Sequence, residues 1–136
     1  WIPDTIMWEN FALAWNSGPF LQYFFNSVIV SISILLIQFM TIIPSAYAFA
    51  RYKFKGSSLL FGLTMITLMI PAQLIFLPVY LMFSKLDLIN SLFALILPFA
   101  SSAFGIFLLR QSFKQVPEEL LESARLDKAS EWKIIY

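Results

Sequence analysis

The 136-residue chain contains no cysteine and no histidine, and only 12% of its residues are charged. Without these two residue types, disulfides, thiolate or imidazole metal sites, and catalysis by Cys–His or Ser–His pairs are excluded within this sequence. The phosphate-binding sequence G-x-x-x-x-G-K-[ST] is also absent. The remaining acidic residues avoid the long apolar runs. We therefore expect no catalytic residue, no metal and no cofactor here, and any ATP to bind elsewhere.

Apolar side chains dominate instead, because 60% of the residues are hydrophobic and 18% are aromatic. A soluble domain has about 45–50% apolar and about 25% charged residues. So few polar groups cannot cover a soluble core, which predicts a protein embedded in membrane lipid. The net charge is only +1, and no basic patch is interleaved with aromatic residues. Nucleic acid is therefore not an expected partner.

Three runs without any charged residue are long enough to cross a membrane. A hydrocarbon layer of about 30 Å needs about 20 helical residues, each adding about 1.5 Å. The sequence therefore predicts an all-α membrane protein with three transmembrane helices. In chain order we expect an external amphipathic segment (1–25), a first span (26–50), a cytoplasmic loop (51–56), a second span (57–83), an external loop (84–90), a third span (91–109) and a cytoplasmic loop (110–136).

The distribution of charge supports this orientation. Eight of the nine lysines and arginines lie in the two loops assigned to the cytoplasm, and Lys85 alone lies outside. Basic residues accumulate on the cytoplasmic side of membrane proteins. The first segment has Asp4 and Glu9 but no basic residue, and Trp8 and Trp15 share a helical face. This pattern is typical of the outer membrane–water interface; stacking of these tryptophans on a sugar is the alternative.

The last stretch of the chain combines charge with an apolar face. Pro117 suits the first position of a helix, because its missing N–H has no intrahelical partner to lose. Leu120 and Ala124, with Leu121 beside them, fall on one face. After a break, Ser130 is suited to cap a second short helix. The sequence thus predicts two short amphipathic helices after a membrane span, a shape that fits a groove on a partner at the membrane surface.

The residues 122–130 read E-S-A-R-L-D-K-A-S and resemble the E-A-A-x-x-D-G-A-S loop of permease subunits of ATP-binding cassette (ABC) importers. A second stretch, A-Y-A-F-A-R-Y-K-F-K-G at 46–56, resembles the A-Y-A-F-A-R-x-x-F-x-G of the carbohydrate-type permeases, the maltose/glycerol-3-phosphate permease-like group. The residues 4–11, D-T-x-x-W-E-N-F, are similar to the external segment that precedes a span in that group. The matches follow the family order along the chain.

The resemblance implies a helical bundle of the type I ABC importer permease kind in the cell (inner) membrane, importing a sugar or a related polyol or glycerol phosphate. It implies ABC ATPase subunits, a second permease subunit and an extracellular or periplasmic solute-binding protein as partners. In that family the matching loop forms coupling helices that sit in a cleft of the ATPase. The positions that match the coupling motif are Glu122, Ala124, Asp127 and Ala129. Since the chain lacks an initiator Met and stops within this loop, we expect a longer protein with further spans.

Two residues depart from the family pattern. Ser123 replaces the usual alanine, which is a mild change, and Lys128 replaces the usual glycine. A left-handed backbone at that position would cost a residue other than glycine about 1 kcal/mol or more. Either the bend is reached with ordinary dihedral angles, or this loop couples less tightly than its relatives.

Prolines and polar residues inside the predicted spans suggest where a solute could pass. Pro44 predicts a kink or close packing against a neighbouring helix. Gln73, between two prolines, is a candidate pathway residue, and a polar residue near the outer interface is the alternative. Ser101 and Ser102 are further pathway candidates, although the small-residue run that contains them is first of all typical of helix packing.

Other functional classes fit less well. An ion-driven secondary transporter normally has an ionisable residue inside a span, and the predicted spans contain none. An intramembrane enzyme needs a nucleophile and a base there, and this pair is missing as well. A purely structural membrane subunit is not excluded by composition.

Overall fold

The computed structural model describes residues 7–136, and in this part of the chain every regular element is a helix. The predicted all-α fold is confirmed. Residues 1–6, including Asp4 of the predicted external segment, lie outside the described residues. In chain order the elements are α1 (Glu9–Asn16), α2 (Phe20–Arg51), α3 (Ser57–Thr67), α4 (Ala72–Lys85), α5 (Leu92–Ile96), the short 3₁₀ helix η1 (Leu97–Phe99), α6 (Ala103–Gln115), α7 (Glu118–Leu126) and α8 (Glu131–Ile135).

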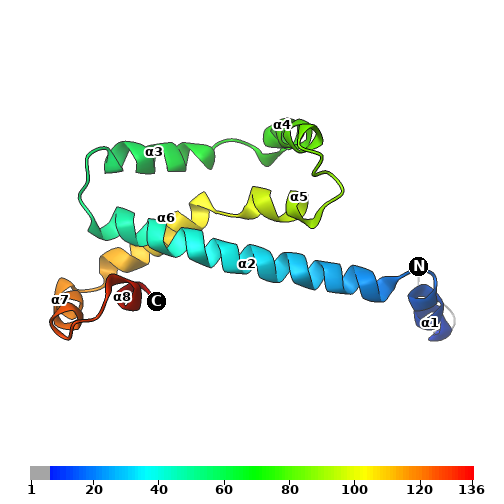
Figure 1. Cartoon of the computed structure of the whole chain (residues 1–136), viewed down its shortest axis with the longest axis horizontal. Coiled ribbons are helices and arrows are strands. Elements are labelled where there is room, and N and C mark those ends of the chain that lie inside the picture. The colour runs from blue at the N-terminus through cyan, green and yellow to red at the C-terminus, as the bar shows by residue number, and fades with distance from the viewer. Residues whose placement is uncertain (1–6) are drawn as a thin grey trace.

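The 32-residue helix α2 is the longest element and runs the length of the molecule (Figure 1). Helix α1 lies at one end of it, and α7 and α8 lie at the other. Among the described residues, α2 is the one unbroken helix that is long and apolar enough to cross a membrane, and it contains the predicted span 26–50. The helix continues through Pro44 without a break, so this proline marks close packing: Ile42 and Ala46 beside it are buried.

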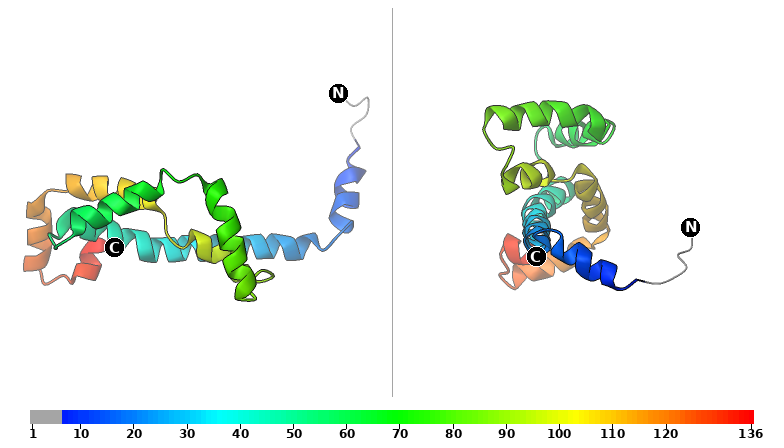
Figure 2. Two further views of the ribbon diagram at one scale, coloured as in Figure 1. Left: turned by 90° about the horizontal axis from the view of Figure 1, so that it is seen from above. Right: turned by 90° about the vertical axis from the view of Figure 1, so that its right-hand side faces the viewer.

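The other two predicted spans correspond to bent pairs of helices. Helices α3 and α4 meet at 96°, and the α5–η1 segment meets α6 at 41°. If each bent pair forms one span, the described residues hold up to three. The first bend is explained by Pro71, the N-cap of α4, because a proline disfavours helical geometry in the residue before it. Figure 2 shows the α3–α4 pair on one side of α2 and the α7–α8 pair on the other. The membrane boundaries themselves stay a prediction.

The packed core lies between α2 and α6, where Ile42, Ala46 and Ile106 are buried together. Gly105 permits this contact: a Cβ added there would lie 2.9 Å from Cδ1 of Ile42, closer than van der Waals contact permits. The prediction that the small-residue run serves helix packing is confirmed for this glycine. Most other large apolar side chains are exposed, as lipid-facing or subunit-facing helices require.

The chain leaves helical geometry between η1 and α6, at residues 100–102, and α2 compensates for this break. The side chain of Gln38 donates a hydrogen bond to the carbonyl of Phe99 at 2.9 Å. The hydroxyl of Thr41 donates to the carbonyl of Ala100 at 2.7 Å. The break lies in the predicted span 91–109, where lipid would offer these carbonyls no other donor. Two polar residues of α2 therefore hold the break in place.

Candidate functional site

The chain ends in the two short helices that the sequence predicts. Pro117 is the N-cap of α7 rather than its first residue, since its ψ of 140° is not helical. Helix α7 therefore begins at Glu118, whose carboxylate lies in the first turn, where it interacts favourably with the helix dipole. Ser130 caps α8 as predicted, because its hydroxyl accepts a hydrogen bond from the N–H of Lys133 at 3.4 Å.

The bend between α7 and α8 depends on a left-handed residue. Lys128 has a φ of 58°, so the bend is not reached with ordinary dihedral angles. The N–H of Lys128 donates to the carbonyl of Arg125, and the N–H of Ala129 donates to that of Ala124, both at 3.0 Å. This pair of bonds is a Schellman motif, in which the left-handed position is usually glycine. The geometry explains physically why glycine suits the family motif here.

We expect Lys128→Gly to stabilise this bend by up to about 1 kcal/mol, because glycine has no Cβ to strain in the left-handed region. Exchange of the Ala129 amide hydrogen in the detergent-solubilised protein should slow by up to about fivefold. Leu126→Gly is the matched control. Leu126 is the last residue of α7, where the backbone is helical and glycine costs about 1 kcal/mol, so exchange of the Ala129 amide should speed up. Faster exchange or lost transport in Lys128→Gly would mean that the lysine has a role of its own.

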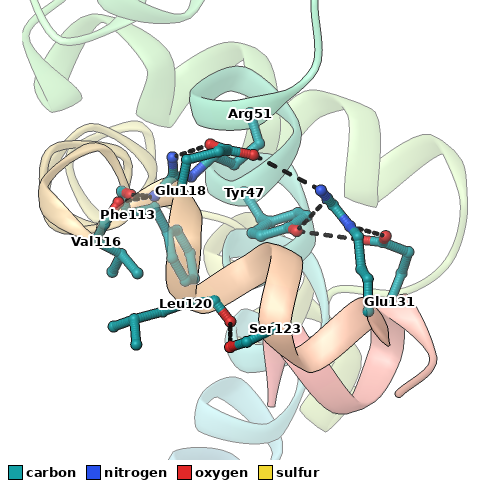
Figure 3. Close-up of polar contacts among 9 residues, drawn as sticks. Tyr47, Arg51, Phe113, Val116, Glu118, Leu120, Ser123 and Glu131 are labelled. Carbon is teal, nitrogen blue, oxygen red and sulfur yellow. Dashed lines mark hydrogen bonds and ion pairs between the residues drawn. The ribbon is translucent and has the colours of Figure 1, made fainter. Parts of the chain in front are cut away.

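Arg51, the last residue of α2, joins three segments at the start of the α7–α8 pair (Figure 3). Its Nη2 donates to the carbonyl of Phe113 at 2.5 Å and to the carbonyl of Val116. Its Nη1 forms an ion pair with Oε2 of Glu118 at 2.8 Å. The Arg51 side chain is only 12% exposed. It therefore fixes the end of α6 and the beginning of α7 to the end of α2.

A second cluster holds α8 against the same helix. The hydroxyl of Tyr47 donates to Oε2 of Glu131 at 3.0 Å, and Nε of Arg125 donates to Oε1 of the same carboxylate at 3.0 Å. Figure 3 shows the Tyr47 hydroxyl facing this carboxylate. The ring of Tyr47 is 1% exposed and packs edge-on against Phe113. Arg125 also lies 3.6 Å from Oε1 of Glu118, so the two clusters form one continuous network.

The network shifts the ionisation of its exposed members. The hydrogen bond from Arg125 is the main cause that lowers the pKa of Glu131 below its ordinary value of 4.5, and the same bond raises the pKa of Arg125. A carboxyl whose pKa is lowered in the folded state stabilises that state above its unfolded pKa. This contribution is lost as the pH falls through the folded pKa.

We therefore expect α8 to loosen from α2 only below about pH 4.5, when Glu131 takes up a proton. The ¹⁹F resonance of 5-fluorotryptophan at Trp132, next to Glu131, should move with a midpoint below that value. In Glu131→Gln the resonance should already lie near its low-pH position and show no such midpoint. A midpoint above pH 4.5 in the unsubstituted protein would contradict the direction of the shift.

The predicted coupling residues divide into two kinds. Glu122 and Asp127 are exposed, and neither carboxylate takes part in the hydrogen bonds or ion pairs found among the described residues. Ala124 and Ala129 are half-buried and form the backbone bond that closes the bend. The four residues thus lie in the last part of α7 and the bend that follows it, with the two carboxylates exposed and the two alanines half-buried.

The predicted apolar face of α7 is split in two. Leu121 is 8% exposed and faces the rest of the chain, whereas Leu120 is 61% exposed. Leu126 and Trp132 are exposed as well, at 83% and 64%. The ring of Trp132 stacks on that of Tyr136 at 6.0 Å. The α7–α8 pair therefore presents apolar side chains outward, beside the free carboxylates.

The predicted pathway residues do not form one site. Ser101 lines an open hollow of about 560 Å³ together with Thr64 and Thr67 of α3. Ser102 caps α6, because its hydroxyl accepts a hydrogen bond from the N–H of Gly105 at 3.1 Å. Gln73 lies exposed in the first turn of α4 and is not among the residues that line this hollow.

Tyr47 and Arg51 are the site residues that sequence reasoning missed. Both lie in the A-Y-A-F-A-R stretch. The resemblance of this stretch to a family motif does not explain why a tyrosine and an arginine occur there. A tyrosine and an arginine four residues apart share one helix face, and an arginine at the end of a span is a usual partner for nearby carbonyls and carboxylates. That signal was present, but it did not identify α7 and α8 as the partners.

Comparison with known proteins identifies the family of this chain. Residues 41–136 match the family described as binding-protein-dependent transport system inner membrane component. The chain is 35% identical to the arabinooligosaccharides transport system permease protein AraQ of Halalkalibacterium halodurans, over 98% of this chain and 48% of that protein. It is 33% identical to the sn-glycerol-3-phosphate transport system permease protein UgpE of Yersinia enterocolitica, over 99% of this chain and 50% of that protein.

A further relative, AraQ of Bacillus subtilis, is 33% identical over 98% of this chain and 48% of its own length. No solved structure matches. The chain thus spans about half the length of the curated relatives it matches. These relatives confirm the predicted resemblance to carbohydrate-type importer permeases and, with it, the helical fold class. The chain belongs to the family of inner membrane components of binding-protein-dependent transport systems.

Proposed function

We propose that this chain forms part of the permease of an ABC importer for a sugar or a related polyol or glycerol phosphate. Relatives in arabinooligosaccharide and sn-glycerol-3-phosphate transport systems support this solute class. The chain is a transport component, and ATP is hydrolysed by separate ABC ATPase subunits. A second permease subunit and an extracellular or periplasmic solute-binding protein complete the importer. The protein crosses the inner membrane several times, with the predicted spans 26–50, 57–83 and 91–109 in this part.

The observation that carries this proposal is the outward face of the α7–α8 pair. Two short helices, held firmly to α2 on one side, present exposed apolar side chains and unpaired carboxylates on the other. An interface core of this kind, apolar with a polar rim, is suited to a groove on another protein. Glu122 and Asp127 would contact the ATPase directly, while Ala124 and Ala129 would set the bend that presents them.

In the proposed mechanism, closure of the ATPase pair on ATP moves the α7–α8 pair as a lever. The spans then rotate as rigid bodies, and the cavity changes from inward-facing to outward-facing. The solute passes the second and third predicted spans. Gln73, Ser101 and Ser102 are the pathway candidates, and the hollow beside Ser101, which also contains two threonine hydroxyls, supports this location.

Cysteine cross-linking in the full-length protein tests this proposal. The described part has no native cysteine, so Glu122→Cys introduces a single thiol at the proposed interface. In membranes from cells that produce the whole importer, this thiol should cross-link to an ATPase subunit through a short homobifunctional maleimide. Lys85→Cys, in the predicted external loop, is the matched control and should not. Labelling of position 122 from the external side, or cross-links to no nucleotide-hydrolysing protein, would overturn the proposal.

A further inference from the structure

Helix α2 contacts two regions that come much later in the chain. The α7–α8 pair lies at its end, and the backbone break at residues 100–102 lies nearer its middle. We propose that α2 transmits the movement of the α7–α8 pair to this break, with Tyr47 and Thr41 as the positioning residues. This inference rests on the proposed function, since it assumes that an ATPase moves the α7–α8 pair.

At the end of α2, the attachment is made by side chains rather than by the chain connection. The α7–α8 pair follows directly after α6, but Pro117 interrupts helical geometry at that junction. The polar side-chain contacts of α7 and α8 lead instead to Tyr47 and Arg51 of α2. A further contact comes from Tyr136, the C-cap of α8, whose hydroxyl donates to the carbonyl of Phe39 at 3.1 Å. Because the ring of Tyr47 is 1% exposed, its hydroxyl cannot follow a displaced Glu131 without movement of α2 itself.

Between its two attachments, α2 continues as a helix through Pro44 and packs closely against α6. Ile42 and Ala46 are buried against Ile106 of α6, and Gly105 leaves no room for even one added carbon beside Ile42. Close-packed interiors of this kind transmit displacement instead of absorbing it. Thr41 directly precedes this packed segment, and Tyr47 directly follows Ala46. We therefore expect a displacement received at Tyr47 to reach Thr41 through this packed segment.

At the break, the hydroxyl of Thr41 and the amide of Gln38 satisfy the carbonyls of Ala100 and Phe99. Since lipid provides no replacement donor, these carbonyls must either follow α2 or exchange one partner for another. Such a choice between discrete arrangements is what coupling between distant sites requires. Ser101, the next residue, lines the hollow proposed as part of the solute path. The contacts thus join the ATPase side of α2 to that path.

A double-mutant cycle in the reconstituted complete importer tests this inference. Tyr47→Phe removes only a hydroxyl, and Thr41→Val replaces a hydroxyl with a methyl group, so both changes preserve the packing. The measured quantity is solute imported per ATP hydrolysed. We expect each single variant to lower this ratio about 2- to 10-fold, the effect of one lost hydrogen bond. If both residues act in one series, the ratio of solute imported to ATP hydrolysed in the double variant should equal that of the single variant with the lower ratio.

Two variants provide matched controls. Tyr23→Phe changes an exposed tyrosine at the far end of α2, and Ser112→Ala changes an exposed serine whose hydroxyl bonds only within its own helix α6. Both should keep the unsubstituted ratio. The inference would be overturned if the two single reductions of this ratio multiply in the double variant. It would also be overturned if the single variants keep the unsubstituted ratio. A complex without ATP-driven import before any substitution would instead overturn the proposed function.

Labelling of Ser101→Cys gives an independent measurement. With a membrane-impermeant maleimide, its rate should differ between the nucleotide-free and ATP-bound importer, because the break moves with α2. Adding Tyr47→Phe should reduce this difference while leaving complex assembly intact. A difference that persists undiminished in Tyr47→Phe means that the break is moved by another route and would overturn the inference.

Discussion

Glu122→Lys or Asp127→Lys in the full-length protein is expected to abolish solute uptake and the stimulation of ATP hydrolysis by the solute-binding protein. Both carboxylates are exposed and lack a partner among the described residues, so neither substitution should disturb the fold by more than about 0.5 kcal/mol. Reversal of charge at an interface costs several kcal/mol when it places like charges together. Stimulated ATPase activity should therefore fall by about 100-fold or more.

Glu9→Lys makes the same charge change at an exposed position of α1, on the predicted external side. Its stimulated ATPase activity should stay within about twofold of the unsubstituted importer, as is usual for surface changes. Amounts of assembled complex, measured by co-purification of the ATPase, separate weak docking from poor expression. Normal stimulation in both loop variants would count against contact of these carboxylates with the ATPase.

Local signals in the sequence were sufficient to predict the elements that depend on neighbouring residues. The two terminal helices and the cap at Ser130 follow from spacing and from hydroxyl chemistry within a few residues. The question raised by Lys128 also had a local answer, since the left-handed bend is fixed by the bonds that close α7. The all-α fold follows from long apolar runs that only helices can bury in lipid.

Contacts between distant segments were not predictable in the same way. Arg51 meets Glu118 across 67 positions, and Tyr47 meets Glu131 across 84. Periodicity places a residue on a helix face but does not say which other helix that face meets. For the same reason, the sequence placed Leu120 and Leu121 together, whereas the structure buries only Leu121. The size of the bend between α3 and α4, 96°, could likewise not be predicted from the sequence, although Pro71 marks its place.

Arg51→Lys is expected to release the α7–α8 pair from α2, whereas Glu118→Gln should leave it almost unchanged. The reason is the unequal worth of the contacts of Arg51. Glu118 is 56% exposed, and ion pairs of this kind contribute about 0–1 kcal/mol. The bonds from Nη2 to the carbonyls of Phe113 and Val116 are shielded and charge-assisted, and such bonds contribute about 1.5–3 kcal/mol each.

Lysine keeps the positive charge but lacks the planar fork that spans these carbonyls and Glu118 at once. We therefore expect Arg51→Lys to cost about 2–3 kcal/mol of local stability, and hydrogen exchange at the amides 122–126 to accelerate by about 30- to 150-fold. In Glu118→Gln the same amides should change by about twofold. Equal acceleration in both variants would mean that the ion pair holds the helices together. The bonds to the carbonyls of Phe113 and Val116 would then contribute less to local stability than their geometry predicts.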